Sequence, residues 1–98
     1  MRLSQYFLGI ECDIDLGAGR RVRALLPAYE LEECFGSREA PESWLQTAID
    51  LSGPIHAATR AEFAREGKAM VVLTGAMVQA QLPLHPRLAP VLTLRRAA

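Results

Sequence analysis

This sequence has no excess of charge of either sign. Its eleven basic and eleven acidic residues give a formal net charge of zero. Because nucleic acids and anionic membranes attract positively charged surfaces, this balance predicts neither as a partner. No apolar run approaches the roughly 20 residues that a membrane-spanning helix needs. No basic segment precedes an apolar run near residue 1, so we expect no signal peptide and a cytoplasmic protein.

Cysteine is also scarce. The two cysteines, Cys12 and Cys34, lack the Cys-x-x-Cys spacing of many metal and redox sites. In a cytoplasmic protein we expect both to be reduced and to pack in the core. The sequence contains no nucleophile motif, and no glycine-rich loop between a strand and a helix that would bind phosphate. We therefore expect no metal site and no cofactor.

What the sequence does contain is the composition of a globular protein, with 50% hydrophobic and 22% charged residues. Ninety-eight residues suffice for one hydrophobic core but leave no room for a second. We expect a single α+β domain over residues 1–82. A proline-rich C-terminal extension with one short strand follows, over residues 83–98.

Residues 10–26 show the two-residue period of paired strands on either side of a glycine-rich turn. Apolar residues alternate with acidic ones before the turn Gly17-Ala18-Gly19, and with arginines after it. Because glycine adopts positive φ without strain, this turn predicts a β-hairpin. Placing Ile14 opposite Val22 then sets three further pairs, Cys12 with Ala24, Asp13 with Arg23 and Asp15 with Arg21.

The acidic residues of this hairpin, Glu11, Asp13 and Asp15, have two interpretations. They could form a metal or acid–base cluster, or they could be one charged, solvent-facing side of the hairpin. A catalytic pair needs two different environments to separate its pKa values, and arginines across the ladder oppose a bound cation. Opposite charges directly across a ladder stabilise it by about 0.2–1 kcal/mol per pair. We therefore interpret the acidic face as structural and exposed.

Two helical segments follow the hairpin. Residues 27–36 predict a short helix with Pro27 in its first turn and Gly36 at its C-terminal end. Over residues 41–66, apolar and small residues recur at spacings of three and four and predict a longer helix. The Gly53-Pro54 step removes a helical hydrogen bond, so the segment either kinks sharply or splits into two helices. The stripe consists of Leu45, Ala48, Ile49, Ser52, Ile55, His56, Thr59 and Phe63.

The last third of the chain predicts strands. Residues 70–73 form a short run rich in β-branched residues, which predicts a buried strand. Residues 77–82 either continue it past an irregularity at Gly75 or form a second strand. Residues 91–94 predict one more short strand after three prolines. The expected fold is α+β and ββααβ-like, with an antiparallel hairpin, two or three helices and one to three C-terminal strands.

His56 is the main candidate for a functional residue in the helical segment. It lies at the margin of the apolar stripe, with Thr59 about one turn along and Glu62 a further turn. A histidine can act as a general base or bind a ligand. One interpretation is therefore a small enzyme or ligand-binding protein that uses His56, Thr59 and Glu62, or His56 with Cys34. The other is a histidine at the edge of the core in a chain without catalytic residues, and we favour this one.

Two stretches of the chain carry a resemblance. They are IHAATRAEFAREGKAMVVLTGAMV, residues 55–78, and more loosely RRVRALLPAYELEECFG, residues 20–36. They resemble a family of small bacterial proteins classed only as a domain of unknown function. Its members similarly show an isoleucine followed by a polar residue or histidine, an alanine-rich helix, an aromatic-Ala-Arg step and a closing strand. The resemblance implies the order hairpin, short helix, long helix and strand, and it implies no activity.

These features favour a non-catalytic binding or interaction module. Exposed edge strands must be paired, covered or charged, so we expect a homodimer, with a different protein partner as the alternative. Nucleic-acid binding would depend on Arg20, Arg21 and Arg23, which we assign to the hairpin.

The expected interface residues lie in two places. Trp44 belongs to a residue type that is enriched in binding hot spots. The apolar strand at residues 91–94 could pair with a sheet edge of its own protomer or of a second copy. Its candidate interface residues are Val91, Leu92 and Leu94.

Overall fold

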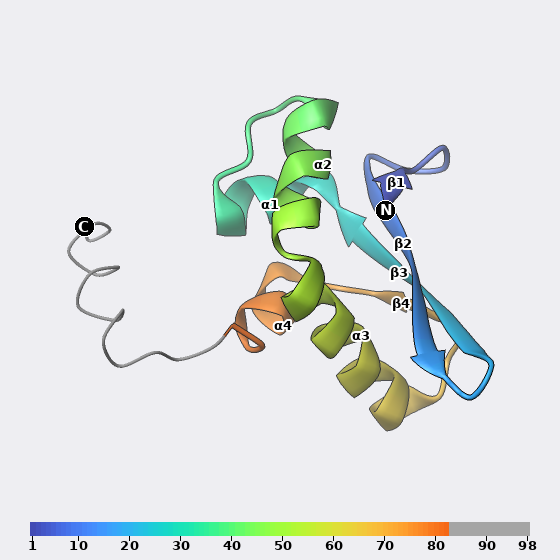
Figure 1. The fold of residues 1–98 in the computed structure, drawn as a ribbon. Coiled ribbons are helices and arrows are strands. Elements are labelled where there is room, and N and C mark those ends of the chain that lie inside the picture. Colours follow the sequence, from blue (N-terminus) through green and yellow to red (C-terminus); the bar gives the residue numbers. More distant parts are fainter. Residues whose placement is uncertain (83–98) are drawn as a thin grey trace.

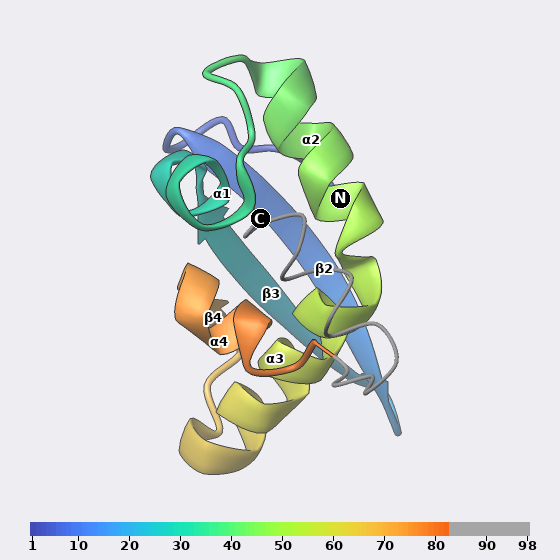
Figure 2. The same ribbon diagram turned by 90° about the vertical axis from the view of Figure 1, so that its left-hand side faces the viewer.

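The fold has two layers, a sheet and a set of helices that cover one of its faces (Figure 1, Figure 2). The computed structural model describes residues 1–82 of the chain. In that range the strands, in their order across one mixed sheet, are β1 (Arg2–Leu3), β2 (Gly9–Gly17), β3 (Arg20–Pro27) and β4 (Met70–Val72). The helices are α1 (Ala28–Phe35), α2 (Pro41–Asp50), α3 (Ser52–Glu66) and α4 (Gly75–Gln79). The expected small α+β fold is confirmed.

Strands β2 and β3 form the predicted hairpin in the predicted register. Asp13 lies opposite Arg23, and Ile14 lies opposite Val22. Residues 17–19 at the turn have φ values of 89°, 53° and 76°. Two of these three positions are glycines, which adopt positive φ without the strain that a Cβ introduces. The sequence therefore determines both the turn and the pairing.

Strand β1 was not predicted, and it changes the environment of Glu11. Arg2 pairs with Glu11 across the β1–β2 ladder. Only 4% of Glu11 is exposed, whereas Asp13 is exposed. The prediction that Glu11 lies on an exposed face is therefore wrong, because the N-terminal residues fold back over this end of β2.

The helix at residues 28–35 is the predicted short one. Pro27 ends β3 and precedes the first helical residue, so it lies one position earlier than we expected. Gly36 ends the helix in a left-handed conformation, as predicted, and its N–H donates to the carbonyl of Glu32. Leu31 is fully buried. Because a helix of this length is marginal alone, its contacts with the rest of the core hold it in place.

The segment over residues 41–66 splits into two helices, which decides between the two predicted alternatives. α2 ends at Asp50, and α3 begins at Ser52. Pro54 lies in the first turn of α3, where a missing N–H removes no intrahelical hydrogen bond. The break between α2 and α3 also divides the predicted apolar stripe. Ile55 in α3 is fully buried, whereas Ile49 in α2 is 48% exposed.

Strand β4 pairs in parallel with β3, with Val72 opposite Leu25. The predicted strand is present, but only one of its faces is buried. Val71 is 7% exposed, whereas Met70 and Val72 are 54% and 56% exposed. A parallel strand buried on both faces needs helices on both sides of the sheet, and here they cover one side.

Residues 75–79 form helix α4, so the prediction of further strand after Gly75 is wrong. Thr74 begins this helix, and its hydroxyl oxygen accepts a hydrogen bond from the N–H of Met77 at 3.2 Å. The Glu30 carboxylate accepts another from the N–H of Gly75 at 2.6 Å. These contacts favour a helix at a place where the apolar pattern fits either structure. The predicted strand at residues 91–94 lies outside the described residues.

The core lies between the sheet and the helices. Its buried apolar residues include Ile10, Cys12, Val22, Ala24, Leu26, Leu31, Ala48, Ile55, Ala58, Val71, Leu73 and Val78. Helices of the length and hydropathy needed to cross a bilayer do not occur among residues 1–82.

Candidate functional site

The face of the sheet opposite the helices, which we call the open face, carries the side chains that alternate with the core residues. They are Arg2, Glu11, Asp13, Asp15, Arg21, Arg23, Leu25, Met70 and Val72. Ion pairs cross the strands at one side of this face and apolar side chains lie at the other. The open face therefore has a charged part over β1–β3 and an apolar part over β3–β4.

Glu11 is a buried carboxylate with all of its partners in place. One of its oxygens accepts a hydrogen bond from Arg2 at 2.9 Å, and the other accepts one from the Ser4 hydroxyl at 2.7 Å. A buried charge is tolerated when it is paired and hydrogen-bonded in this way. Glu11 thus connects the N-terminal residues to β2, which is a structural role.

Asp13 forms ion pairs with two arginines. Its oxygens lie 2.9 Å from Arg2 Nη1 and 3.1 Å from Arg23 Nε. Hydrogen bonds from Arg2 and then Arg23 lower the pKa of Asp13 below its ordinary value. A general acid or base requires a pKa near the working pH, so this shift is in the wrong direction for such a role.

The pH dependence of stability follows from that shift. Asp13 titrates near pH 3.9 in an unfolded chain and lower in the folded one, so its contribution to stability is complete above about pH 4. The contribution is lost as the pH falls below that value. Because these ion pairs are solvent-exposed, we expect replacing both Asp13 and Asp15 with Asn to lower the free energy of unfolding by at most about 1–2 kcal/mol.

Urea denaturation at several pH values measures this effect. The difference in the free energy of unfolding between wild type and the double variant should become smaller as the pH is lowered below about 4. Glu39→Gln is the control, because Glu39 forms no ion pair with residues 1–82. A difference that is constant with pH would contradict the assignment to Asp13.

The third acidic residue, Asp15, lies opposite Arg21 as predicted but forms no ion pair with it in residues 1–82. Its carboxylate instead accepts a hydrogen bond from the N–H of Gly17 at 2.8 Å, beside the bulge that precedes the turn. Arg21 therefore has no ion-pair partner among the described residues.

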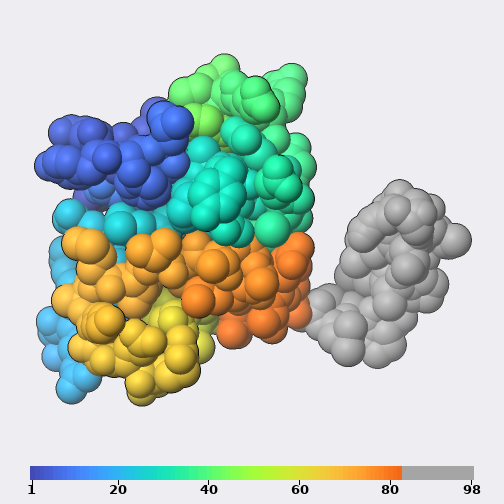
Figure 3. Space-filling model, turned by 180° about the vertical axis from the view of Figure 1, so that it is seen from behind, coloured from blue at the N-terminus to red at the C-terminus, as the bar shows by residue number. Residues whose placement is uncertain are grey.

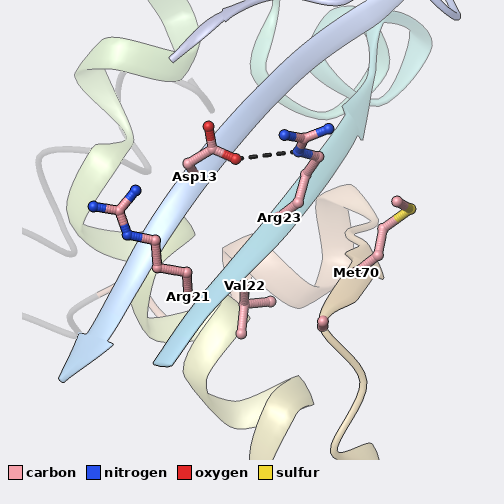
Figure 4. Close-up of a pocket in the computed structure, with 6 residues that line it drawn as sticks. Asp13, Arg21, Val22, Arg23 and Met70 are labelled. Atoms are coloured by element: carbon pink, nitrogen blue, oxygen red, sulfur yellow. Dashed lines mark hydrogen bonds and ion pairs between the residues drawn. The ribbon is translucent and has the colours of Figure 1, made fainter. Parts of the chain in front are cut away.

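A shallow concavity of about 380 Å³ lies beside Arg21 on the open face, between β3 and the start of β4 (Figure 4). Figure 4 shows the Asp13–Arg23 ion pair at this place, with Met70 on the neighbouring strand. Asp13, Arg21, Arg23 and Met70 belong to its lining. The concavity is where the charged and apolar parts of the open face meet.

The outer edge of β4 is the other notable feature. The carbonyl of Ala69 accepts a hydrogen bond from Arg23, and the N–H of Leu73 donates to Leu25. Because backbone groups of a strand point alternately to its two sides, those of Met70 and Val72 point away from β3. No strand of the described chain pairs with this side. β4 is therefore an edge strand in which the backbone N–H and C=O groups of Met70 and Val72 point away from the sheet.

The three residues of the alternative ligand-site interpretation, His56, Thr59 and Glu62, each have separate contacts. His56 Nε2 lies 3.4 Å from Arg60 Nη2, beside an open groove of about 470 Å³ on α3. Thr59 is fully buried and its hydroxyl donates to the carbonyl of Ile55 at 2.8 Å. Glu62 pairs with Arg65. Among these three residues, only His56 lines the groove.

His56→Gln is expected to leave the melting temperature unchanged within about 2 °C, because a half-buried residue with one long contact contributes little to stability. Thermal unfolding measures this. Binding of any assayed ligand should also match that of wild type. Loss of binding at an unchanged melting temperature would assign His56 to a ligand site.

Trp44 is half-buried and packs against the core, and its indole N–H donates to Glu32 at 2.7 Å. It joins α2 to α1, and its role as an interface residue stays a prediction. The other predicted interface residues, Val91, Leu92 and Leu94, lie outside the described part of the chain.

The cysteines are both free thiols. Cys12 lies in the core as predicted, and burial raises its pKa to about 11. Cys34 is half-buried and does not belong to the core, so the prediction that it packs there is wrong. Burial, followed by the neighbouring Glu30 carboxylate, raises the pKa of Cys34 as well. A nucleophilic cysteine needs a lowered pKa, so neither thiol is activated. The enzyme interpretation that pairs His56 with Cys34 gains no support from these surroundings.

The fold and this surface define a small two-layer α+β domain whose sheet ends, beside β3, in the uncharged edge strand β4. Comparisons with models of protein families, with curated proteins and with solved structures find nothing that matches the chain. Within residues 1–82, no three His, Cys, Asp or Glu side chains are grouped so that they could hold a metal ion. The surface of the described residues is therefore what indicates a function.

Proposed function

We propose that this protein is a non-catalytic interaction module that binds an extended protein segment along the outer edge of β4. The observation that supports this proposal is the combination of outward-pointing backbone groups with exposed apolar side chains at Met70 and Val72. An extended segment that adds to a sheet edge gains main-chain hydrogen bonds, and its alternate side chains give specificity.

The two edges of the sheet differ in a way that favours β4. Proteins protect edge strands with charges, prolines, bulges or very short length. At the other edge, β1 is two residues long and carries Arg2, and β2 beyond it carries Asp13 and Asp15. Residues 69–78 contain no charged residue and no proline. Both edge strands are short, since β4 itself has three residues, so the β4 edge differs from the other by its lack of charge, and it is the one that we expect to be paired.

A selection of random short peptides on the immobilised full-length protein tests the proposal. We expect the selected peptides to carry apolar or β-branched residues at alternate positions. They should bind the Val72→Thr variant, which keeps both the N–H and the branched side chain. They should not bind Val72→Pro, which lacks the outward N–H.

Two results would contradict the proposal. Peptides that bind the Val72→Pro variant as well as wild type would place the binding surface elsewhere. A selection that enriches nothing, combined with a chain that is monomeric in solution, would leave β4 without a strand partner. Membership of the bacterial family named above and a cytoplasmic location stay predictions from the sequence.

A further inference from the structure

We propose that the strand that pairs with β4 is β4 of a second copy of this chain, in an antiparallel arrangement about a two-fold axis at Val71. This inference rests on the proposed function and names its partner. It predicts a homodimer whose two four-stranded sheets join into one continuous sheet.

The backbone of β4 fits this arrangement without a change of register. With the axis at Val71, Met70 of one copy lies opposite Val72 of the other, and the reverse pair forms by symmetry. Both residues point their N–H and C=O groups outward, so each pair can exchange two hydrogen bonds. Val71 lies on the axis with its own backbone groups turned toward β3, as residues of a non-hydrogen-bonded pair must be. The three residues of β4 thus form a self-complementary unit.

The side chains of the open face agree with this pairing. Leu25 lies opposite Val72 in one copy, and Met70 of the other copy would come next in the same row. The next residue in that row is Arg23 of the other copy, so the row is apolar from Leu25 to Met70 across the axis, and cross-strand apolar pairs stabilise a ladder. Lys68, the first charged residue before β4, would lie opposite Thr74 of the other copy. The register therefore places no like charges opposite one another along the strand.

Further apolar residues belong to segments that lie on the same side of the molecule as β4. Figure 3 shows this side, with the first residues and α1 above the segment that holds β4 and α4. Leu8 and Tyr29 are 75% and 61% exposed, and the carbonyl of Leu8 accepts the N–H of Ala28. A stable dimer needs more contact area than two three-residue strands supply, so apolar residues on this side of the molecule would have to add to it.

Light scattering of the full-length chain tests the dimer. We expect wild type and Val72→Thr to show twice the monomer mass of 10.8 kDa and to dissociate on dilution. Val72→Pro should show the monomer mass. Because its missing N–H points away from β3, the β3–β4 hydrogen bonds should survive, and an unchanged circular dichroism spectrum checks this. If the proline variant fails to fold, Val72→Lys replaces it, since lysine blocks edge pairing without removing an N–H.

Cysteine crosslinking tests the register. In a Cys34→Ser background, the Met70→Cys and Val72→Cys variants are prepared separately and then mixed under mild oxidation. Cα atoms of a hydrogen-bonded antiparallel pair lie about 5.5 Å apart, within the range that a disulfide spans. We expect a disulfide between the two different variants, and little between two copies of the same one. Efficient crosslinking of either variant with itself would overturn the axis at Val71.

The remaining outcomes separate this inference from the proposed function. A monomeric wild type that still selects peptides through β4 would overturn the second copy as partner and keep the interaction module. A dimer that Val72→Pro leaves intact would overturn the β4 contact. If truncation after Leu82 also abolishes that dimer, the contact is made by the C-terminal segment instead of β4.

Discussion

Replacing Ile55 with alanine is expected to lower the free energy of unfolding by about 2–5 kcal/mol, the range for removing a large buried aliphatic side chain. Ile55 is fully buried in the core, in the first turns of α3. Removing three of its carbons takes away apolar contacts and leaves a cavity that the surrounding side chains fill only in part. A fall of this size is a large fraction of the total stability of a domain of this length. Urea denaturation followed by circular dichroism measures it.

Ile49→Ala is the matched control. Ile49 belongs to the same predicted stripe and is chemically identical, but 48% of it is exposed. Its replacement should lower the free energy of unfolding by less than about 1 kcal/mol, since less apolar area leaves the protein interior. Similar effects at the two positions would show that α2 and α3 present one continuous apolar face, which contradicts the break at Leu51.

Gly9→Ala is expected to lower the free energy of unfolding by about 1–3 kcal/mol, the range for overpacking. A Cβ at this position would meet the carbonyl oxygen of Leu26 and would lie 2.9 Å from the Cα of Pro27. Both obstacles are backbone atoms of β3, and Gly9 pairs with Pro27 in the ladder. The strand cannot move away without disturbing this end of the hairpin. Thermal unfolding should show a fall of about 4–24 °C, at about 4–8 °C per kcal/mol.

Gly53→Ala serves as its control and should change the free energy of unfolding by less than about 1 kcal/mol. Gly53 lies in the first turn of α3, and no atom outside its chain neighbours would lie within 4 Å of a Cβ there. Alanine favours the helix over glycine by up to about 1 kcal/mol, and the ring of Pro54, which disfavours the helical conformation of a preceding residue with a Cβ, offsets part of that gain. A stabilising Gly9→Ala would show that β2 and β3 are not as close as the structure has them.

The hairpin could be predicted because all of its determinants are local. The two-residue period, the turn and the alternation of charges lie within residues 10–26, and together they leave only one register that buries the apolar side. The break near Pro54 is local for the same reason, since proline acts on the preceding turn of its own helix.

The parts that could not be predicted depend on residues far apart in the sequence. Glu11 has the pattern of an exposed strand residue, and it is buried because Arg2 and Ser4 fold back onto it. The short stretch at residues 76–80 is apolar except for Gln79 and is compatible with a helix or a strand. The hydrogen bond between Glu30 and Gly75 favours the helix. Thr74 was the one local signal for that helix, as a capping residue before the run.

The candidate site shows the same division. Residues 70–73 were predicted as a strand, but the sequence does not indicate which neighbour it has or which of its sides is free. The order of strands in the sheet decides both, and local patterns do not reveal that order because three helices separate β3 from β4 along the chain. The absence of charge over residues 69–78 was the signal that could have drawn attention to this edge.

The parallel pairing of β3 and β4 has a consequence for the order of folding. It brings Leu25 next to Val72 across a connection that contains α1, α2 and α3. Contacts between such distant positions form late, because closing a long loop costs entropy before the contact stabilises it. Until β4 has joined β3, nothing orients the backbone groups of Met70 and Val72 in one direction. A partner that recognises this edge therefore recognises only chains that have completed their fold. Assembly then occurs after the folding stages in which unpaired strands can aggregate.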